Sequence, residues 1–270
     1  MPELPEVETS RRGIAPHLTG QTIRQLIVRN AQLRWPIPDD LAAKVNGQEI
    51  TQITRRAKYL LLALKQGAIM VHLGMSGRVR VVNAELPAEK HDHVDLVLAS
   101  GQCLRFTDPR RFGSWLWHPS PRSEQLLSHL GPEPLTDEFN FDYLYPLCRN
   151  RKAAIKQVIM DNQVVVGVGN IYATEALFAS GIRPTRSAQK VTQQQLKQLI
   201  QHIKRILAAA IEQGGTTLKD FTRSDGKPGY FKQALQVYGR AGEACDSCGS
   251  TIKTTRQGQR ASAYCPSCQK

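Results

Sequence analysis

Apolar and polar residues alternate over much of the first half of the chain. Val94, Leu96 and Leu98, for example, would share one face of a strand. Short runs of this alternating or apolar kind cover residues 21–30, 48–53, 59–64, 68–73, 77–82, 93–99 and 112–117. Because glycine and proline punctuate these runs, the pattern predicts a β-sandwich or barrel.

The segments on either side of the strands have a different pattern. Residues 5–18 are expected to form a helix, with Pro5 in its first turn and Gly20 just beyond its end. After the strands, residues 129–140 contain two prolines and few apolar residues. This composition predicts a hinge before a second region.

The second region has helical periodicity. Residues 155–159 indicate a short helix. A glycine-rich turn then leads to Asn170, which is predicted to be the N-cap of a helix that ends near Gly181. A longer helix is expected between a capping box at residues 192–195 and Gly214, with its apolar stripe in the core. Residues 214–231 are rich in glycine and polar residues, and long loops of this kind are either functional lids or disordered.

The charge balance indicates the kind of partner. The 270 residues include 36 Lys and Arg against 23 Asp and Glu, which gives a formal net charge of +13. This excess of positive charge is typical of proteins that bind nucleic acid, because each neutralised phosphate releases a counterion. A merely basic protein, or one that binds acidic membranes, has the same composition, so charge alone leaves these alternatives open.

The first residues and the apolar runs bear on location. The start MPELPEVETS carries carboxylates where a signal peptide has basic and then apolar residues. The longest apolar runs are too short to span a bilayer. We therefore expect a cytoplasmic protein.

Four cysteines near the end of the chain form two C-x2-C pairs, Cys245 with Cys248 and Cys265 with Cys268. The spacing lies within the zinc-ribbon range, and turn-like residues surround each pair. Two disulfides are the alternative, which a cytoplasmic location disfavours. One structural Zn2+ with four protein ligands is therefore predicted, and it has no open position for catalysis. Cys103 and Cys148 lie apart from these pairs in apolar surroundings and are expected in the core.

Sequence motifs along the whole chain resemble those of the formamidopyrimidine-DNA glycosylases. In order, the motifs are MPELPEVE, RRAKYLLL, HLGMSG, KHDHVDL, TDPRRFG, LGPEPL, GVGNIYATEALF, GGTTLKDF, SDGKPGYF and the final cysteine pairs. The resemblance implies an α+β fold, in which an N-terminal β-sandwich with flanking helices precedes a helix-two-turn-helix domain and a zinc-bound β-hairpin. The corresponding domains are residues 1–133, residues 134–229 with a lesion-recognition loop at about 214–230, and residues 230–270.

The resemblance also implies the chemistry. The family is a bifunctional glycosylase and lyase that removes oxidised purines, such as 8-oxoguanine and formamidopyrimidines, from duplex DNA and cleaves the strand by β,δ-elimination. Pro2 matches the nucleophile, a secondary amine that forms only if Met1 is removed. Glu3 matches the acid–base at the sugar, Lys58 the lysine that assists β-elimination, and Arg260 the arginine assigned to δ-elimination.

The remaining matches concern DNA recognition. Base flipping leaves a gap in the duplex that side chains must fill. Met75, Arg110 and Phe112 match the three residues that fill it, although in isolation Met75 and Phe112 would be assigned to the core. The positions that match phosphate contacts are His91, Arg151, Lys156 and Asn170. The implied partner is double-stranded DNA with oxidised purines or abasic sites, and no pattern indicates an oligomer, so a monomer is expected.

Two alternatives have other functions. An endonuclease VIII-like enzyme shares Pro2, Glu3 and the zinc finger but acts on oxidised pyrimidines, and Met75 with the run Asp108–Gly113 favours the purine enzyme instead. A non-enzymatic DNA-binding module, or more remotely a zinc-ribbon translation or transcription factor, would account for charge and zinc. Neither of these binders explains the Pro2–Glu3 start or Lys58.

Overall fold

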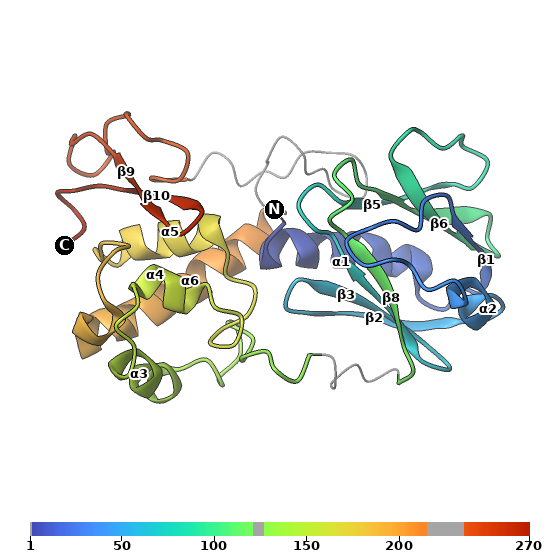
Figure 1. Cartoon of the computed structure of the whole chain (residues 1–270), viewed down its shortest axis with the longest axis horizontal. Coiled ribbons are helices and arrows are strands. Elements are labelled where there is room, and N and C mark those ends of the chain that lie inside the picture. Colours follow the sequence, from blue (N-terminus) through green and yellow to red (C-terminus); the bar gives the residue numbers. More distant parts are fainter. Residues whose placement is uncertain (1, 121–126, 215–234) are drawn as a thin grey trace. The chain divides into compact units, whose positions relative to one another are not determined.

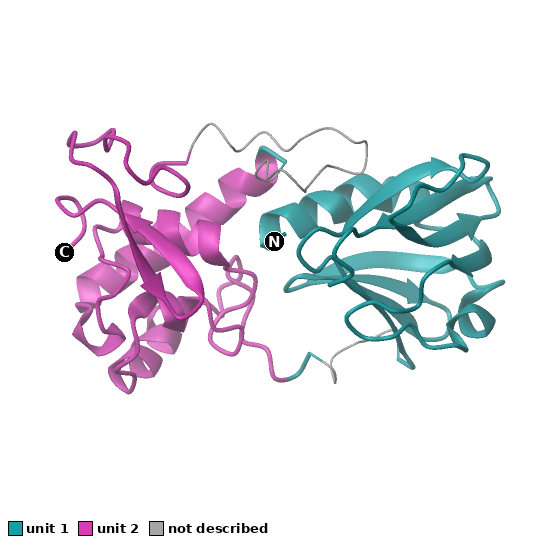
Figure 2. Cartoon of the chain, turned by 45° about the horizontal axis from the view of Figure 1, so that its top comes forward, with its two compact units in different colours: residues 1–128, 213–230 teal, residues 129–212, 231–270 magenta. Residues whose placement is uncertain are grey.

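The computed structural model describes residues 2–120, 127–214 and 235–270. The chain forms two compact units, residues 1–128 with 213–230 and residues 129–212 with 231–270 (Figure 2). Most of the segment predicted as a lid, residues 214–231, lies outside the described residues. The zinc hairpin and the helices before it belong to one unit, and the predicted division into three domains stays a prediction.

The first unit contains two four-stranded antiparallel sheets (Figure 1). The first sheet has the order β1-β6-β7-β5, formed by Ile23–Val28, Asp92–Leu98, Gln102–Thr107 and Arg78–Asn83. The second has the order β2-β3-β4-β8, formed by Ile50–Arg56, Tyr59–Leu64, Ala68–His72 and Ser114–His118. The sheets share one apolar core, so the predicted β-sandwich is confirmed.

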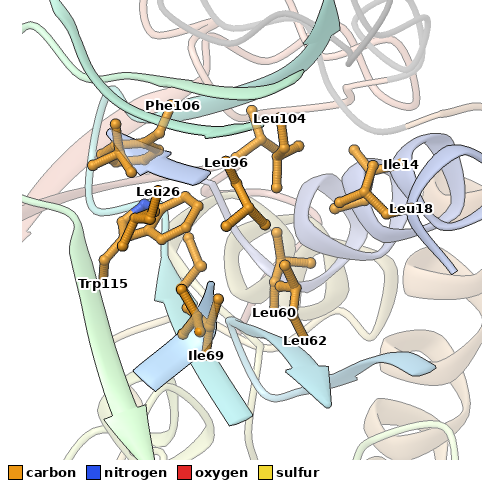
Figure 3. Close-up of a cluster of buried hydrophobic side chains, with 14 of the residues drawn as sticks. Ile14, Leu18, Leu26, Leu60, Leu62, Ile69, Leu96, Leu104, Phe106 and Trp115 are labelled. Atoms are coloured by element: carbon orange, nitrogen blue, oxygen red, sulfur yellow. The ribbon is translucent and has the colours of Figure 1, made fainter. Parts of the chain in front are cut away.

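Side chains from both sheets meet in that core (Figure 3). Leu96 and Phe106 come from the first sheet, and Leu62 and Trp115 come from the second. All four are fully buried, and Phe106 meets Trp115 edge-on with ring centroids 6.0 Å apart. Burial of such side chains contributes roughly 1.5–3 kcal/mol each.

Helix α1 (Leu4–Leu18) also packs on this core, where it buries Ile14 and Leu18 (Figure 3). Pro5 lies in its first turn, where the absent amide hydrogen is not needed, and Gly20 follows its end at φ +80°. The predicted helix is therefore confirmed. Figure 1 also shows the short helix α2 (Leu41–Val45), which the sequence pattern did not predict.

Strand β7 was missing from the predicted strands because Arg105 interrupts its short run of apolar residues. Arg105 is 1% exposed, and its guanidinium binds both carboxylate oxygens of Asp95 on neighbouring β6 at 2.9 Å. A partner on another strand thus makes a charged side chain compatible with burial.

The second unit contains the helices α3 (Phe141–Arg149), α4 (Ile155–Ile159), α5 (Asn170–Ala179) and α6 (Gln193–Glu212), with a 3-10 turn, η1 (Ala188–Lys190). The capping box of α6 is confirmed, since the Gln195 amide donates to Thr192 Oγ1 and the Thr192 amide to Gln195 Oε1, both at 3.2 Å. Helix α3 was not predicted, and Pro146 lies inside it. Among the described residues, no helix is both long and apolar enough to cross a membrane.

The chain ends in the hairpin β9 (Lys253–Gln257) and β10 (Arg260–Tyr264), which pairs Arg260 with Gln257 around a turn that contains Gly258 at φ +60°. Strand β10 packs against α5. The hairpin therefore has a helical support within its own unit.

Candidate active site and zinc centre

The first predicted catalytic pair lies where α1 begins. Pro2 is buried immediately before the helix, and Glu3, its N-cap, is 2% exposed. The Glu3 amide donates to Glu6 Oε2 at 2.8 Å, which fixes the backbone at this point.

Lys58 lies in the tight turn between β2 and β3 and is 8% exposed. The preceding residue, Ala57, has φ +54°, a left-handed conformation that is uncommon for a residue with a Cβ. Such outliers gather at functional sites because the surrounding structure must hold them. The turn between β2 and β3 thus holds Lys58 in a mostly buried position.

His72, at the end of β4, is a buried titratable residue near Lys58 that the sequence analysis did not single out. Burial, reinforced by the nearby charges of Lys58 and Arg34, lowers the pKa of His72 to about 4. Its Nδ1 accepts the Gly74 amide at 3.0 Å, so the neutral ring carries its proton on Nε2. The neutral imidazole thus lies close to the charges of Lys58 and Arg34.

The three residues predicted to fill the gap in the duplex are exposed. Met75 is 37% and Phe112 is 41% exposed, so neither belongs to the core, and Arg110 is exposed beside them. The Arg110 guanidinium carbon lies 4.9 Å from the centre of the Phe112 ring. We call these three side chains the wedge residues. An exposed thioether and phenyl ring beside a guanidinium suit insertion between bases.

The loops that carry the wedge residues are in backbone contact. A Cβ added to Gly74 would lie 2.3 Å from the Phe112 carbonyl carbon, so only glycine fits. His91, another predicted DNA contact, joins this region through its carbonyl, which accepts the Asp108 amide at 3.0 Å. The first unit therefore gathers His91 and the wedge residues on adjoining loops.

In the second unit, Lys156 is 2% exposed and its ammonium lies between α5 and β10. Nζ donates to Asn170 Oδ1 and to Ser262 Oγ, both at 2.7 Å. Asn170 Nδ2 in turn donates to the Ala261 carbonyl at 3.2 Å. Two predicted phosphate-binding residues are thus joined to each other and to the hairpin.

The predicted N-cap role of Asn170 is wrong. Gly169 is the N-cap of α5, and Asn170 is its first helical residue. The side chain of Asn170 does not cap the helix, because Lys156 and the hairpin engage it instead.

Arg151 and Arg260 are more accessible than Lys156. Arg151 binds Asp161 at 3.1 Å, with the two side chains 35% and 36% exposed. Arg260 is exposed at the start of β10. A cavity of about 290 Å³ between α4 and the hairpin is lined by Lys156, Gln157, Met160, Gln257, Gly258, Gln259, Arg260 and Ser262. The cavity brings Lys156 and Arg260 together but not Arg151.

Glu175 on α5 is a second residue that the sequence analysis missed. Its buried carboxylate accepts the amides of Gln236, Val237 and Tyr238 at 2.8, 3.0 and 2.8 Å. Burial raises the pKa of Glu175, and the three amides oppose that rise. This carboxylate fixes the chain where it enters the zinc module.

The four predicted cysteines come together next to that segment. The Cys245 and Cys268 sulfurs are 4.0 Å apart, those of Cys248 and Cys265 are 3.4 Å apart, and all four lie within 4.8 Å of one another. Sulfurs about 2.3 Å from a tetrahedral zinc lie about 3.8 Å apart, so this cluster fits one Zn2+. The site holds one structural zinc, and its four protein ligands leave no position for substrate.

The fold and these sites define a class of zinc-finger proteins in which a β-sandwich is joined to a helical unit. Three family descriptions cover most of the chain. They are the formamidopyrimidine-DNA glycosylase N-terminal domain at residues 1–115, the formamidopyrimidine-DNA glycosylase H2TH domain at 130–222, and the zinc finger found in FPG and IleRS at 242–270. The formamidopyrimidine-DNA glycosylase of Stutzerimonas stutzeri is 59% identical over 100% of both chains. The chain belongs to the formamidopyrimidine-DNA glycosylase family.

Solved structures show the same likeness. The MutM (Fpg) protein of Thermus thermophilus is 36% identical, with a TM-score of 0.89 over 99% of this chain and 98% of that one. A Lactococcus lactis Fpg mutant in complex with DNA that contains Fapy-dG is 31% identical, with a TM-score of 0.92 over 100% of both chains. The Lactococcus lactis Fpg in complex with abasic-site DNA is 32% identical, with a TM-score of 0.91 over 99% of both chains.

Proposed function

We propose that this protein is a base-excision repair enzyme, a DNA-formamidopyrimidine glycosylase that also cleaves the strand at abasic sites. Its substrate is double-stranded DNA that contains 8-oxoguanine, formamidopyrimidines or abasic sites. The observation that carries the proposal is the placement of Pro2 beside buried Glu3 at the start of α1, in a chain of this family. A proline amine beside a buried carboxylate suits nucleophilic catalysis, and a protein that only binds DNA has no use for it.

Recognition begins with extrusion of the damaged nucleotide, which costs a few kcal/mol. The wedge residues fill the space that the base leaves, and Arg110 offers a forked donor to the orphaned cytosine. His91 in the first unit, and Arg151, Lys156 and Asn170 in the second, bind phosphates. Lys156 and Asn170 are held in place by their mutual hydrogen bond and by β10.

The chemistry starts once removal of Met1 has made the Pro2 nitrogen a secondary amine. This nitrogen attacks C1′, the glycosidic bond breaks, and the base leaves with a proton. Glu3 exchanges a proton at the sugar ring oxygen, and the opened sugar is then held as an iminium ion on Pro2. The iminium withdraws electrons and makes the 2′ proton acidic.

Two eliminations then cleave the strand. Loss of the 2′ proton breaks the C3′–O bond, a step that Lys58 assists from its fixed position in the β2–β3 turn. A second elimination breaks the C5′–O bond and involves Arg260, which lies exposed on the hairpin. We propose that the enzyme works as a monomer in the cytoplasm, on the DNA of the nucleoid.

Borohydride trapping tests the proposal. The protein is incubated with a duplex that carries 8-oxoguanine opposite cytosine, with a thymine glycol duplex, and in parallel as the Pro2→Gly variant. A covalent adduct on the first duplex, lost or much weakened in Pro2→Gly, is the expected result. An adduct mainly on the thymine glycol duplex would show that the protein acts on oxidised pyrimidines. If intact mass shows that Met1 is removed and neither duplex gives an adduct, the protein is a DNA-binding module and not a glycosylase.

A further inference from the structure

Asp108 is a fully buried carboxylate that follows β7 and takes no part in the proposed chemistry. Both of its oxygens are engaged. Oδ1 accepts the Ser76 hydroxyl at 2.7 Å, and Oδ2 accepts the Gly113 amide at 2.8 Å. One side chain thus joins the loop that contains Met75 to the loop that contains Arg110 and Phe112.

Ser76 extends this connection. Its Oγ accepts the Arg110 amide at 3.2 Å while its own hydrogen goes to Asp108. A chain of hydrogen bonds therefore runs from the backbone of one wedge residue, through the neighbour of another, to a buried carboxylate. Linked bonds of this kind hold a geometry more tightly than separate ones.

The backbone of Asp108 is fixed as well. Its amide donates to the His91 carbonyl at 3.0 Å, and its carbonyl accepts the Arg111 amide at 3.2 Å. The ring of His93 contacts the same carbonyl through Nε2 at 2.9 Å. Asp108 is thus fixed to β6 and to the segment before it, and it can act as the anchor for both loops.

The loops need such an anchor because their backbone is strained and tightly packed. Arg111, between Arg110 and Phe112, has φ +55°. A Cβ on Gly113 would come within 2.6 Å of Phe106 Cζ. A turn that is strained and tightly packed relaxes unless hydrogen bonds hold it.

The side chains on these loops receive little support of their own. Met75 is 37% and Phe112 is 41% exposed, whereas Ser76 is only 4% exposed and Asp108 is buried. The exposed side chains of Met75 and Phe112 therefore depend on buried Ser76 and Asp108 for their position. We propose that Asp108, acting through Ser76, is a positioning residue that holds the wedge residues ready to enter the DNA before DNA is bound.

This inference rests on the proposed function, since it gives the wedge residues their role in base flipping. A wedge that is ordered in advance loses less entropy when it enters the duplex. Loss of the anchor should slow insertion while leaving Pro2, Glu3 and Lys58 in place. The effect belongs to recognition and not to bond breaking.

The test measures insertion directly. A duplex with a tetrahydrofuran abasic analogue and a neighbouring 2-aminopurine is mixed with protein in a stopped-flow instrument, and the rise in fluorescence reports unstacking. Ser76→Ala should slow this phase about tenfold, because the variant loses the buried hydroxyl that joins the Arg110 amide to Asp108. Asp108→Asn should keep most of the rate, because its amide can donate to Ser76 Oγ and its oxygen can still accept from Gly113.

Ser114→Ala is the matched control. Ser114 is 1% exposed in the same unit, and its hydroxyl has no hydrogen-bond partner in the part of the chain that the structure describes. This variant should insert at the wild-type rate. An insertion rate of Ser76→Ala equal to that of Ser114→Ala would overturn the inference. A Ser76→Ala variant that is unfolded by circular dichroism, together with an Asp108→Asn variant that also inserts slowly, would overturn it as well.

A double-mutant cycle separates positioning from general destabilisation. If Ser76 acts through the wedge, Ser76→Ala should slow insertion by less than twofold when added to Phe112→Ala. Full additivity would contradict the inference. The tetrahydrofuran analogue cannot react, so the insertion rate does not depend on the chemistry that borohydride trapping measures. Failure of the glycosylase proposal would appear in the trapping experiment, and failure of this inference would appear in the insertion rates.

Discussion

The ammonium of Lys156 lies 2.7 Å from the Oδ1 atom of Asn170, and both side chains also contact the hairpin strand β10. A buried lysine is costly unless its charge is well solvated by acceptors. Here the amide of Asn170 and the hydroxyl of Ser262 solvate it without neutralising it. The ammonium therefore keeps its positive charge inside a network of neutral acceptors.

Replacing Asn170 with Asp should convert this pair into an ion pair and weaken DNA binding. The new carboxylate would hold Lys156 and repel phosphate, so we expect a loss of at least about tenfold in affinity, with the salt dependence reduced by the equivalent of about one phosphate contact. The Kd for an uncleavable duplex, measured at several salt concentrations, checks this.

Asn170→Ala is the comparison for that variant, since it removes the amide but adds no charge. It should weaken binding less than Asn170→Asp does. Equal affinity of Asn170→Asp and the wild type would show that Lys156 does not meet a phosphate.

His72 should make the protein less stable in mild acid. Its pKa is about 4 in the folded chain against an ordinary 6.5, so between these values the unfolded chain binds a proton that the folded chain does not. The stabilisation is complete above about pH 6.5 and is lost as the pH falls toward 4, by up to about 3 kcal/mol. Urea unfolding at pH 7.5 and pH 5 measures the difference.

His72→Asn keeps an acceptor for the Gly74 amide but cannot take up a proton. The free energy of unfolding should therefore fall less between pH 7.5 and pH 5 in this variant than in the wild type. An unchanged pH dependence would show that His72 is not the responsible group.

Cys248→Ser should remove the zinc. Loss of one of four thiolates opens the site, and a hairpin with so small a core depends on the metal. Metal analysis should give one zinc per wild-type chain and close to none in the variant. The DNA affinity should fall at least about tenfold, because the hairpin that carries Arg260 and Ser262 is no longer folded. Cys148→Ala, at a buried cysteine outside the cluster, should keep one zinc per chain. A zinc-free variant with full DNA affinity would contradict a structural role.

Glu175→Gln should destabilise the second unit. One oxygen that accepts backbone amides becomes an NH2 group, which places donor against donor in a buried site, and the expected cost is about 2 kcal/mol. Glu243→Gln is the control, because Glu243 is 59% exposed where it binds Arg240 and should change the stability by less than about 1 kcal/mol. Hydrogen exchange at the amides of residues 236–238 should quicken in Glu175→Gln alone. Equal protection in both variants would refute the role.

The features that could be predicted from the sequence depend on nearby residues. The first helix and the capping box of α6 are specified within a few positions, and the cysteine pairs define a zinc site by spacing alone. The missed features depend on distant partners. Strand β7 is made possible by Asp95, which pairs with Arg105, and the neutral state of His72 comes from burial beside Lys58.

The candidate site divides in the same way. The family motifs named the residues of the site, but no local rule places a carboxylate of α5 against the amides of residues 236–238. Asn170 was misassigned because a helix start normally uses such a side chain for capping, whereas a lysine and a strand far along the chain engage it here. The common cause of these errors is a hydrogen bond between a polar side chain and a residue distant in the sequence.

The strand order of the sandwich affects how the protein can be made. Strand β1 pairs with β6, and β4 pairs with β8, so both sheets depend on strands from the far end of the unit. At a synthesis rate of about 5–20 residues per second, the early strands wait several seconds for their partners on the ribosome. The first residues thus leave the ribosome well before either sheet can complete its strand pairing.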